Sequence, residues 1–268
     1  MRRYIFLLFI ILAFSSFANA QELYVSTEPA SNMPKNSVGL RLTNEGMFNT
    51  SVQTRFIPEI MVGVSKDLML HANIFISDFY QDKQKFEGYG FYGKYRFLSI
   101  DTIHQHFRGA AYARYAHVKN PLINDEISLE GDNSGLQGGI VFTQLLHKLA
   151  LSASLNYTKA TNNGGGYKLL PNQAKDALGY TFSTGYLIYP KTYTSYNQPN
   201  LNFYIEFLGK SNISKSQNFM DIAPALQLIL NSKIRIDISQ RLQLYGNMNR
   251  TTKNMYLLRF EYNLFNVF

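Results

Sequence analysis

Ionisable residues recur at alternate positions in many short segments of this 268-residue sequence, and this spacing is the first pointer to chemistry. In the first half of the chain these positions are mostly basic: Arg41, Arg55, Glu59, Lys94, Arg96, Arg108 and Arg114. In the second half they carry both signs: Glu206, Lys210, Asp221, Arg235, Asp237, Arg241, Arg259 and Glu261. Alternate residues of an extended strand point to the same side. If the segments enclose one water-filled space, its more basic wall favours anionic or zwitterionic solutes.

The same charges have a second interpretation, in which they pair with one another and fill the space that they face. An unpaired buried charge is costly, so pairing across a narrow lumen is expected. Twelve strands about 4.8 Å apart, tilted by about 40°, give a backbone diameter of about 24 Å, and side chains leave about 10 Å or less. An open or gated pore for small solutes and a plugged lumen both agree with the pattern.

Residue types that would support catalysis or a metal centre are scattered. The five histidines are His71, His104, His106, His117 and His147; there is no cysteine, and no G-x-S-x-G motif occurs. A membrane hydrolase needs a serine, a histidine and a third group that orients the imidazole ring, and no histidine here has such neighbours in sequence. Two histidines at 104 and 106 are too few for a metal site. The sequence predicts no enzyme, no cofactor and no metal.

A polar stretch in the middle of the chain is the other candidate for ion binding. Its acidic residues are Asp125, Glu126, Glu130 and Asp132. Carboxylates in such a loop can take a divalent cation or bridge it to lipopolysaccharide. We expect instead a solvated acidic loop.

The elements that position the charged residues are predicted to be strands, as the last segment of the chain illustrates. Between residues 256 and 268, apolar Leu258, Phe260, Tyr262 and Leu264 alternate with Arg259, Glu261 and Asn263. This is the pattern of a strand with lipid on one side and water on the other. The final Phe268 resembles the C-terminal aromatic that the assembly machinery of bacterial outer-membrane barrels recognises.

Period-two alternation with intervening turn signals repeats along the chain. It predicts twelve strands, at residues 37–47, 54–64, 68–77, 87–97, 107–118, 135–145, 149–158, 178–189, 201–210, 219–230, 234–244 and 256–268. The longest connections, 119–134 and 159–177, both follow odd-numbered strands, which indicates that both termini are periplasmic. The predicted fold class is all-β, a transmembrane antiparallel up-and-down β-barrel of about twelve strands.

Pro58 and Pro224 conflict with this pattern, because a proline inside a strand removes a ladder hydrogen bond. We expect a bulge or kink at each position. A sharper hypothesis is a lateral opening for apolar substrates.

The start of the chain and its composition indicate export to the outer membrane of a Gram-negative bacterium. Arg2, Arg3, an apolar run and Ala18-Asn19-Ala20 form a secretory signal peptide over residues 1–20. Residues 21–36 form an N-terminal periplasmic extension, which either stays outside or folds back as a plug, and residues 37–268 form the barrel. The 20 Phe and 19 Tyr suit the aromatic girdles of a barrel. The net charge of +8 comes without a basic run, so nucleic acid is not an expected partner.

Three segments carry a family resemblance: ELYVSTEPASNMPKNSVGLRL at 22–42, PNLNFYIEFLGKSN at 199–212 and APALQLILNSKIRIDIS at 223–239. They resemble a group of small, mostly uncharacterised outer-membrane proteins assigned to meta-pathway phenol degradation or transport. The resemblance implies a barrel with an uptake or export role and no agreed substrate. It assigns no functional residues.

The expected function is passage of small solutes through the barrel, with the charged residues of the opening paragraph other than Lys210 and Arg241 lining the path. Expected partners are outer-membrane lipid, lipopolysaccharide, the barrel-assembly machinery and a small solute. A non-conducting structural or adhesion barrel, acting through its extracellular loops, is the alternative, and an outer-membrane hydrolase is a third. A secreted β-sandwich explains the alternation but not the terminal phenylalanine.

Overall fold

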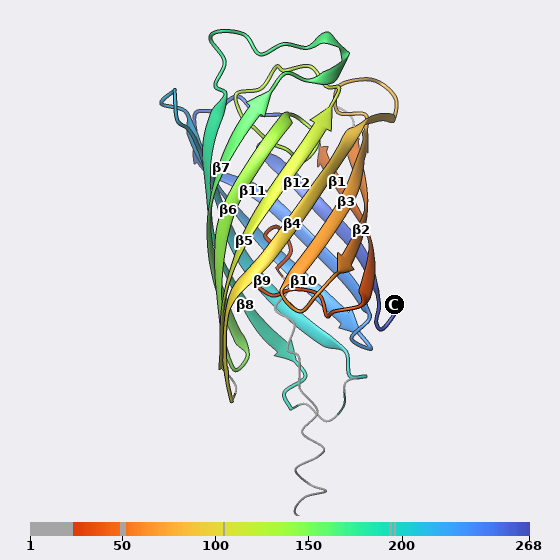
Figure 1. Ribbon diagram of the computed structural model, residues 1–268. Coiled ribbons are helices and arrows are strands. Elements are labelled where there is room, and N and C mark those ends of the chain that lie inside the picture. The colour runs from red at the N-terminus through yellow and green to blue at the C-terminus, as the bar shows by residue number, and fades with distance from the viewer. Residues whose placement is uncertain (1–23, 49–51, 104, 193–194, 196) are drawn as a thin grey trace, which may run out of the picture.

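Twelve antiparallel strands close into a barrel in the computed structural model, which describes residues 24–48, 52–103, 105–192, 195 and 197–268 (Figure 1). The strands are β1 (Ser37–Phe48), β2 (Val52–Gly63), β3 (Leu68–Ser77), β4 (Lys85–Thr102), β5 (Gln105–Val118), β6 (Ser134–Leu146), β7 (Leu149–Thr161), β8 (Asp176–Tyr189), β9 (Asn200–Asn212), β10 (Asn218–Leu230), β11 (Ile234–Gly246) and β12 (Asn254–Leu264). Each strand pairs with the next, and β1 pairs with β12. The predicted fold class and strand count are confirmed.

The register of the closing pair shows how charge is directed inward. Arg41 on β1 stands opposite Glu261 on β12 and Glu59 on β2. Their outward neighbours are apolar: Leu40 is 49% exposed and Phe260 48%, whereas Glu261 is 1% exposed. Apolar outside and polar inside is the reverse of a water-soluble domain, so the outer face requires lipid.

Helical structure in the described residues is one 3-10 turn, η1 (Gly164–Gly166), between β7 and β8. No described helix has the length and apolar character needed to cross a membrane.

Several boundaries differ from the sequence-based prediction. The turn expected around 98–106 is instead a continuation of the β4–β5 hairpin, in which Thr102 still pairs with Gln105. The last strand ends at Leu264, and Phe268 lies beyond it with 63% of its surface exposed. Its role in assembly stays a prediction. The signal peptide at 1–20 lies outside the described residues.

Both strand prolines interrupt pairing on one side only. Pro58 is paired with Leu42 of β1, but toward β3 the pairing passes from Phe56 directly to Glu59. Pro224 behaves likewise: it is paired toward β9, while pairing toward β11 skips it. The register is the same before and after each gap, so no extra residue is inserted and the expected bulges are simple interruptions. A lateral opening stays a hypothesis.

Two segments outside the strands enter the barrel. Residues 24–36 lie within the ring of strands, as the red segment in Figure 1 shows, and Tyr24, Val25 and Ala30 are at most 1% exposed. From the β5–β6 connection, Ile127 and Leu129 are 2% and 3% exposed. Of the two alternatives for residues 21–36, staying outside or folding back as a plug, the described residues 24–36 take the second, and charged groups of the barrel interior bind residues 24–31. The lumen is therefore occupied from two directions.

The lipid-facing assignment predicts a depth-dependent effect of charge. Leu155, at the centre of β7, is 52% exposed, and Leu136, near the start of β6, is 60% exposed. We expect Leu155→Arg to lower the free energy of unfolding in lipid vesicles by about 2–4 kcal/mol and Leu136→Arg by about 1 kcal/mol or less. Urea titrations of both refolded variants measure this. Equal effects at the two positions would contradict the assignment.

Candidate functional site: a cavity between two inserted segments

One anchor of the N-terminal segment is a buried carboxylate. Glu206, at the middle of β9, is 0% exposed. Its oxygens accept hydrogen bonds from the backbone N–H groups of Val25, Ser26 and Thr27 at 3.0, 2.7 and 2.9 Å, and from the Thr27 hydroxyl at 2.7 Å. Successive N–H groups converging on one anion form a backbone nest. The nest stabilises a carboxylate that would otherwise be buried without a counter-charge.

Glu28 of the same segment places a negative charge against the basic part of the barrel wall. Its carboxylate lies 3.2 Å from Arg41 and 3.5 Å from Lys94. Burial raises the pKa of Glu28, but the positive charges of Lys94 and Arg41 outweigh it and hold the pKa well below its usual range. The Lys94 ammonium, 0% exposed, also donates to the carbonyls of Pro29 at 2.7 Å and Ser31 at 2.8 Å. One lysine therefore holds three residues of the segment.

Two arginines also hold the segment, by donating hydrogen bonds to its backbone carbonyls. Arg235 donates to the carbonyl of Tyr24, and Arg259 to that of Val25 at 2.7 Å. Charge-assisted hydrogen bonds of this kind are about twice as strong as neutral ones. These side chains were predicted to line a solute path, and in this state they hold the plug.

The β5–β6 connection is held by the same means from the other side. Glu126 lies 3.0 Å from Lys210, 3.4 Å from Arg250 and 3.9 Å from Arg241. Burial raises the pKa of Glu126, but Lys210, Arg241 and Arg250 together lower it to about 2. The expected solvated acidic loop is therefore corrected, because three of its four carboxylates, those of Glu126, Glu130 and Asp132, pair with basic side chains.

Two further carboxylates of this loop bind arginines of the barrel. Glu130 pairs with Arg114, and Asp132 with Arg55 at 2.7 Å. Arg55 also pairs at 2.9 Å with Glu87, which is 1% exposed and which sequence reasoning missed. The register between β3 and β4 shifts at Phe75/Ile76, so simple alternation does not place Glu87 inside. Glu45, 8% exposed, was also missed, although continued alternation along β1 was enough to find it.

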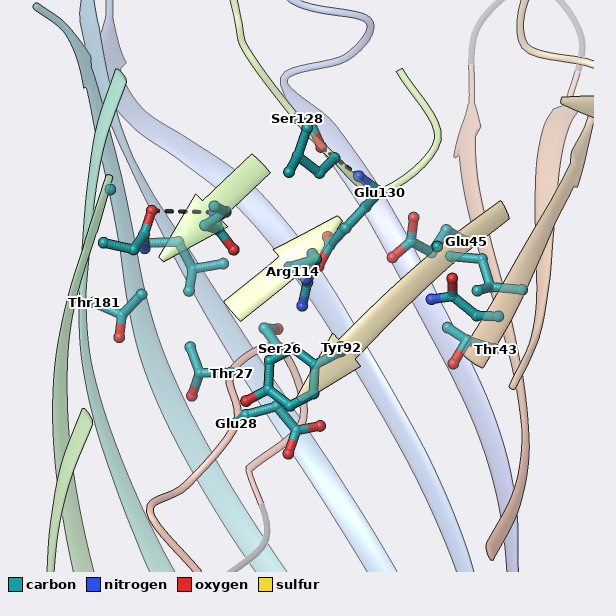
Figure 2. Close-up of a pocket in the computed structure, with 18 of the residues that line it drawn as sticks. Ser26, Thr27, Glu28, Thr43, Glu45, Tyr92, Arg114, Ser128, Glu130 and Thr181 are labelled. Carbon is teal, nitrogen blue, oxygen red and sulfur yellow. Dashed lines mark hydrogen bonds and ion pairs between the residues drawn. The ribbon is translucent and has the colours of Figure 1, made fainter. Parts of the chain in front are cut away.

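Between the two inserted segments lies a cavity of about 240 Å³. Figure 2 shows Ser26, Thr27 and Glu28 on one side of it and Ser128 and Glu130 on the other, with Tyr92 and Arg114 between. Its ionisable lining is balanced, with Arg41, Arg114, Lys210, Arg241 and Arg259 against Glu28, Glu45, Glu59, Glu126 and Glu130.

Of the predicted path residues, only Arg41, Glu59, Arg114 and Arg259 line this cavity. The others make contacts outside it, and those of Arg55, Lys94, Glu206 and Arg235 are described above. Arg96 lies 3.1 Å from Asp67, and Arg108 lies 2.8 Å from Ser31 and 3.2 Å from Asp101. Asp221 pairs with Arg250 at 2.9 Å, Asp237 with Arg235 at 2.8 Å, and Glu261 with Arg41 at 2.9 Å. The alternation of charged residues thus identifies side chains that face the interior, but it does not distinguish those that line the cavity from those that anchor the inserted segments.

An aromatic group borders the cavity on the β3–β5 side. The Tyr92 ring lies 4.9 Å from the His71 ring and 5.6 Å from the Tyr112 ring, centroid to centroid. The Arg114 guanidinium lies 5.6 Å from the centre of the Tyr92 ring. In the described part of the chain, no three acidic or histidine side chains gather as a metal site requires. His104 lies outside it.

Comparison with solved structures gives the same fold. The chain is similar to the COG4313 outer membrane channel from Pseudomonas putida F1, with a TM-score of 0.57 and 8% identity over 90% of this chain and 100% of that chain. It also matches a KdgM porin, with a TM-score of 0.45 and 11% identity over 84% of this chain and 98% of that chain. No family model and no curated protein matches the sequence, so the resemblance of the three segments to a phenol-degradation or transport group is not confirmed.

The Glu206 nest predicts how the plug is released. Glu206→Gln removes the charge and replaces one of the two accepting oxygens by an N–H₂ group that faces other donors, which we expect to free residues 25–27 at a cost of about 1–3 kcal/mol per unsatisfied buried group. A Ser26→Cys probe in this cysteine-free chain then reacts with a polar maleimide at least about tenfold faster. Ser183→Ala keeps the carboxylate and removes hydroxyl contacts to Glu206 at 3.3 Å and to Thr27 at 3.0 Å, so it is the comparison variant, with a much smaller expected increase in the labelling rate. Equal labelling rates in all three backgrounds would contradict the anchor.

The Glu126 cluster predicts the pH at which the loop leaves. Because the pKa of Glu126 is lowered to about 2, its ion pairs stabilise the docked loop fully above about pH 4.3 and are lost as pH falls toward 2. We expect a nitroxide at Ser128→Cys to be immobile from pH 7 to about 5 and to gain mobility below about pH 4. Glu126→Gln should be mobile already at pH 7. A spectrum that does not change down to pH 2 would contradict this.

Proposed function

We propose that this protein is an outer-membrane barrel that passes small polar solutes, with residues 24–36 and the β5–β6 connection as its gates. One observation carries the proposal: two non-strand segments enter the lumen and enclose a polar cavity between them. A solved structure with the same fold is an outer membrane channel, which supports it. Passage requires both segments to leave their docked positions.

Placement in the membrane follows from the two faces and two ends of the barrel. The outer face is apolar, and the C-terminus lies at the end opposite the long β7–β8 connection (Figure 1). Short turns at the periplasmic end and long loops outside are usual in such barrels. We therefore place the termini in the periplasm and the outer surface against lipid and lipopolysaccharide, with Phe268 as the assembly signal.

An anion preference belongs to the open state in this proposal. With the segments docked, Glu28, Glu126 and Glu130 neutralise the wall. Withdrawal of residues 24–36 also leaves Lys94 and Arg235 without the backbone carbonyls that they bind. The exposed wall then carries excess positive charge, which attracts anions. That the protein is not an enzyme stays a prediction.

Planar-bilayer recordings of the refolded mature protein test the function. We expect rare or small conductance steps in the full chain, and larger, more frequent, anion-selective steps after deletion of residues 21–36. In the deleted form, replacement of Lys94 and Arg235 by glutamine should reduce the anion preference, whereas the outward change Tyr89→Phe should leave it unchanged.

Folding is checked by heat-modifiable migration on a gel. A folded barrel that conducts in neither form would overturn the proposal and favour the non-conducting alternative that acts through loops.

A further inference from the structure

We infer that the cavity wall formed by His71, Asn73 and Tyr92 is a binding site for a neutral, hydroxyl-rich solute of about one sugar ring. The inference rests on the proposed function and names its substrate class. Three polar atoms carry it: Nε2 of His71, Oδ1 of Asn73 and the hydroxyl of Tyr92 are buried and have no hydrogen-bond partner among the described residues. All three side chains line the same cavity, and His71 and Tyr92 are 6% and 7% exposed.

Glu59 fixes which hydrogen-bonding capacity these side chains present. Its carboxylate lies 3.3 Å from Nδ1 of His71 and accepts a hydrogen bond from Nδ2 of Asn73 at 3.4 Å. A carboxylate beside Nδ1 selects the tautomer with the proton there, so Nε2 is an acceptor. Arg41 holds Glu59 in turn at 2.9 Å. The wall therefore offers two acceptors and one hydroxyl, which a solute with several O–H groups satisfies.

Gly90 keeps one of these acceptors in place. A Cβ at this position would come within 2.5 Å of Oδ1 of Asn73. Gly90 itself lines the cavity, and the absence of a side chain there leaves room for the acceptor. Close approach of a ligand to backbone is a common reason for glycine in a strand.

The charges of the cavity argue for a neutral solute. Glu28, Glu59, Glu126 and Glu130 each have a basic partner within 4.0 Å, and so has every arginine and lysine of the lining. A charged solute would have to break one of these pairs or remain uncompensated, and both are costly in a buried space. Glu45, which also lines the cavity, is 8% exposed and has no ion pair at this distance among the described residues. It offers a further acceptor for a hydroxyl.

Size and shape agree with one ring. At about 30 Å³ per water molecule, a cavity of about 240 Å³ has room for roughly eight waters. The rings of His71, Tyr92 and Tyr112 supply an apolar surface beside the polar atoms. Aromatic surface with a few placed polar groups is the usual composition of a small-molecule site.

Saturation-transfer NMR with the refolded full-length mature chain tests the site. The probes are D-glucose, D-glucuronate and D-glucosamine, which share a ring and differ in charge. We expect glucose to bind with the lowest Kd, and Tyr92→Phe to weaken glucose binding by about five- to tenfold, the loss of one hydrogen bond. His71→Gln and Gly90→Ala should also weaken it, and outward Tyr89→Phe should not.

Tighter binding of glucuronate or glucosamine, or equal glucose binding by Tyr92→Phe and Tyr89→Phe, would overturn the inference. Binding is measured here without transport, so the result is independent of the bilayer recordings. A barrel that conducts but binds no glucose loses only this site, and one that binds glucose but never conducts loses the proposed function and keeps the site.

Discussion

Charge compensation inside the lumen is the constraint on which the rest of this structure depends. An arginine- and lysine-rich wall enclosed by lipid-facing strands cannot stay dry and unpaired. Strand carboxylates such as Glu59, Glu87 and Glu261 neutralise some of these basic side chains. The inserted segments supply Glu28 and Glu126, which pair with others. The basic wall and the acidic segments are therefore two parts of one arrangement.

The chemistry of these contacts also explains why the closure can be reversible. An apolar plug would be held in the barrel mainly by the burial of its own hydrophobic surface. Residues 24–31 bury Tyr24, Val25 and Ala30 in small apolar clusters, but they are also held by a carboxylate, an ammonium and guanidinium groups acting on backbone atoms. Water can hydrate each of those groups when the segment leaves, so the difference between the two states is much smaller than the strength of the individual bonds suggests.

Strand positions were predictable because lipid outside and water inside impose a period of two, which β7 and β12 follow without interruption. The ends of the strands near 98–106 and near Phe268 were harder to predict, because pairing with a neighbouring strand decides where a strand ends. The interior charges were found, but their partners were not: Glu206 meets residues about 180 positions earlier. Alternation carries no information about irregular segments, so neither the plug nor the inward loop could be placed from it.

The anchors of residues 24–26 lie late in the chain, with Glu206 on β9, Arg235 on β11 and Arg259 on β12. The contact between Val25 and Arg259 spans 234 residues. Residues 24–26 are synthesised before these strands and therefore have no anchors until the last strands are in position. Closure of the lumen by this segment is consequently a late event in biogenesis, and its docking indicates that the ring of strands is complete.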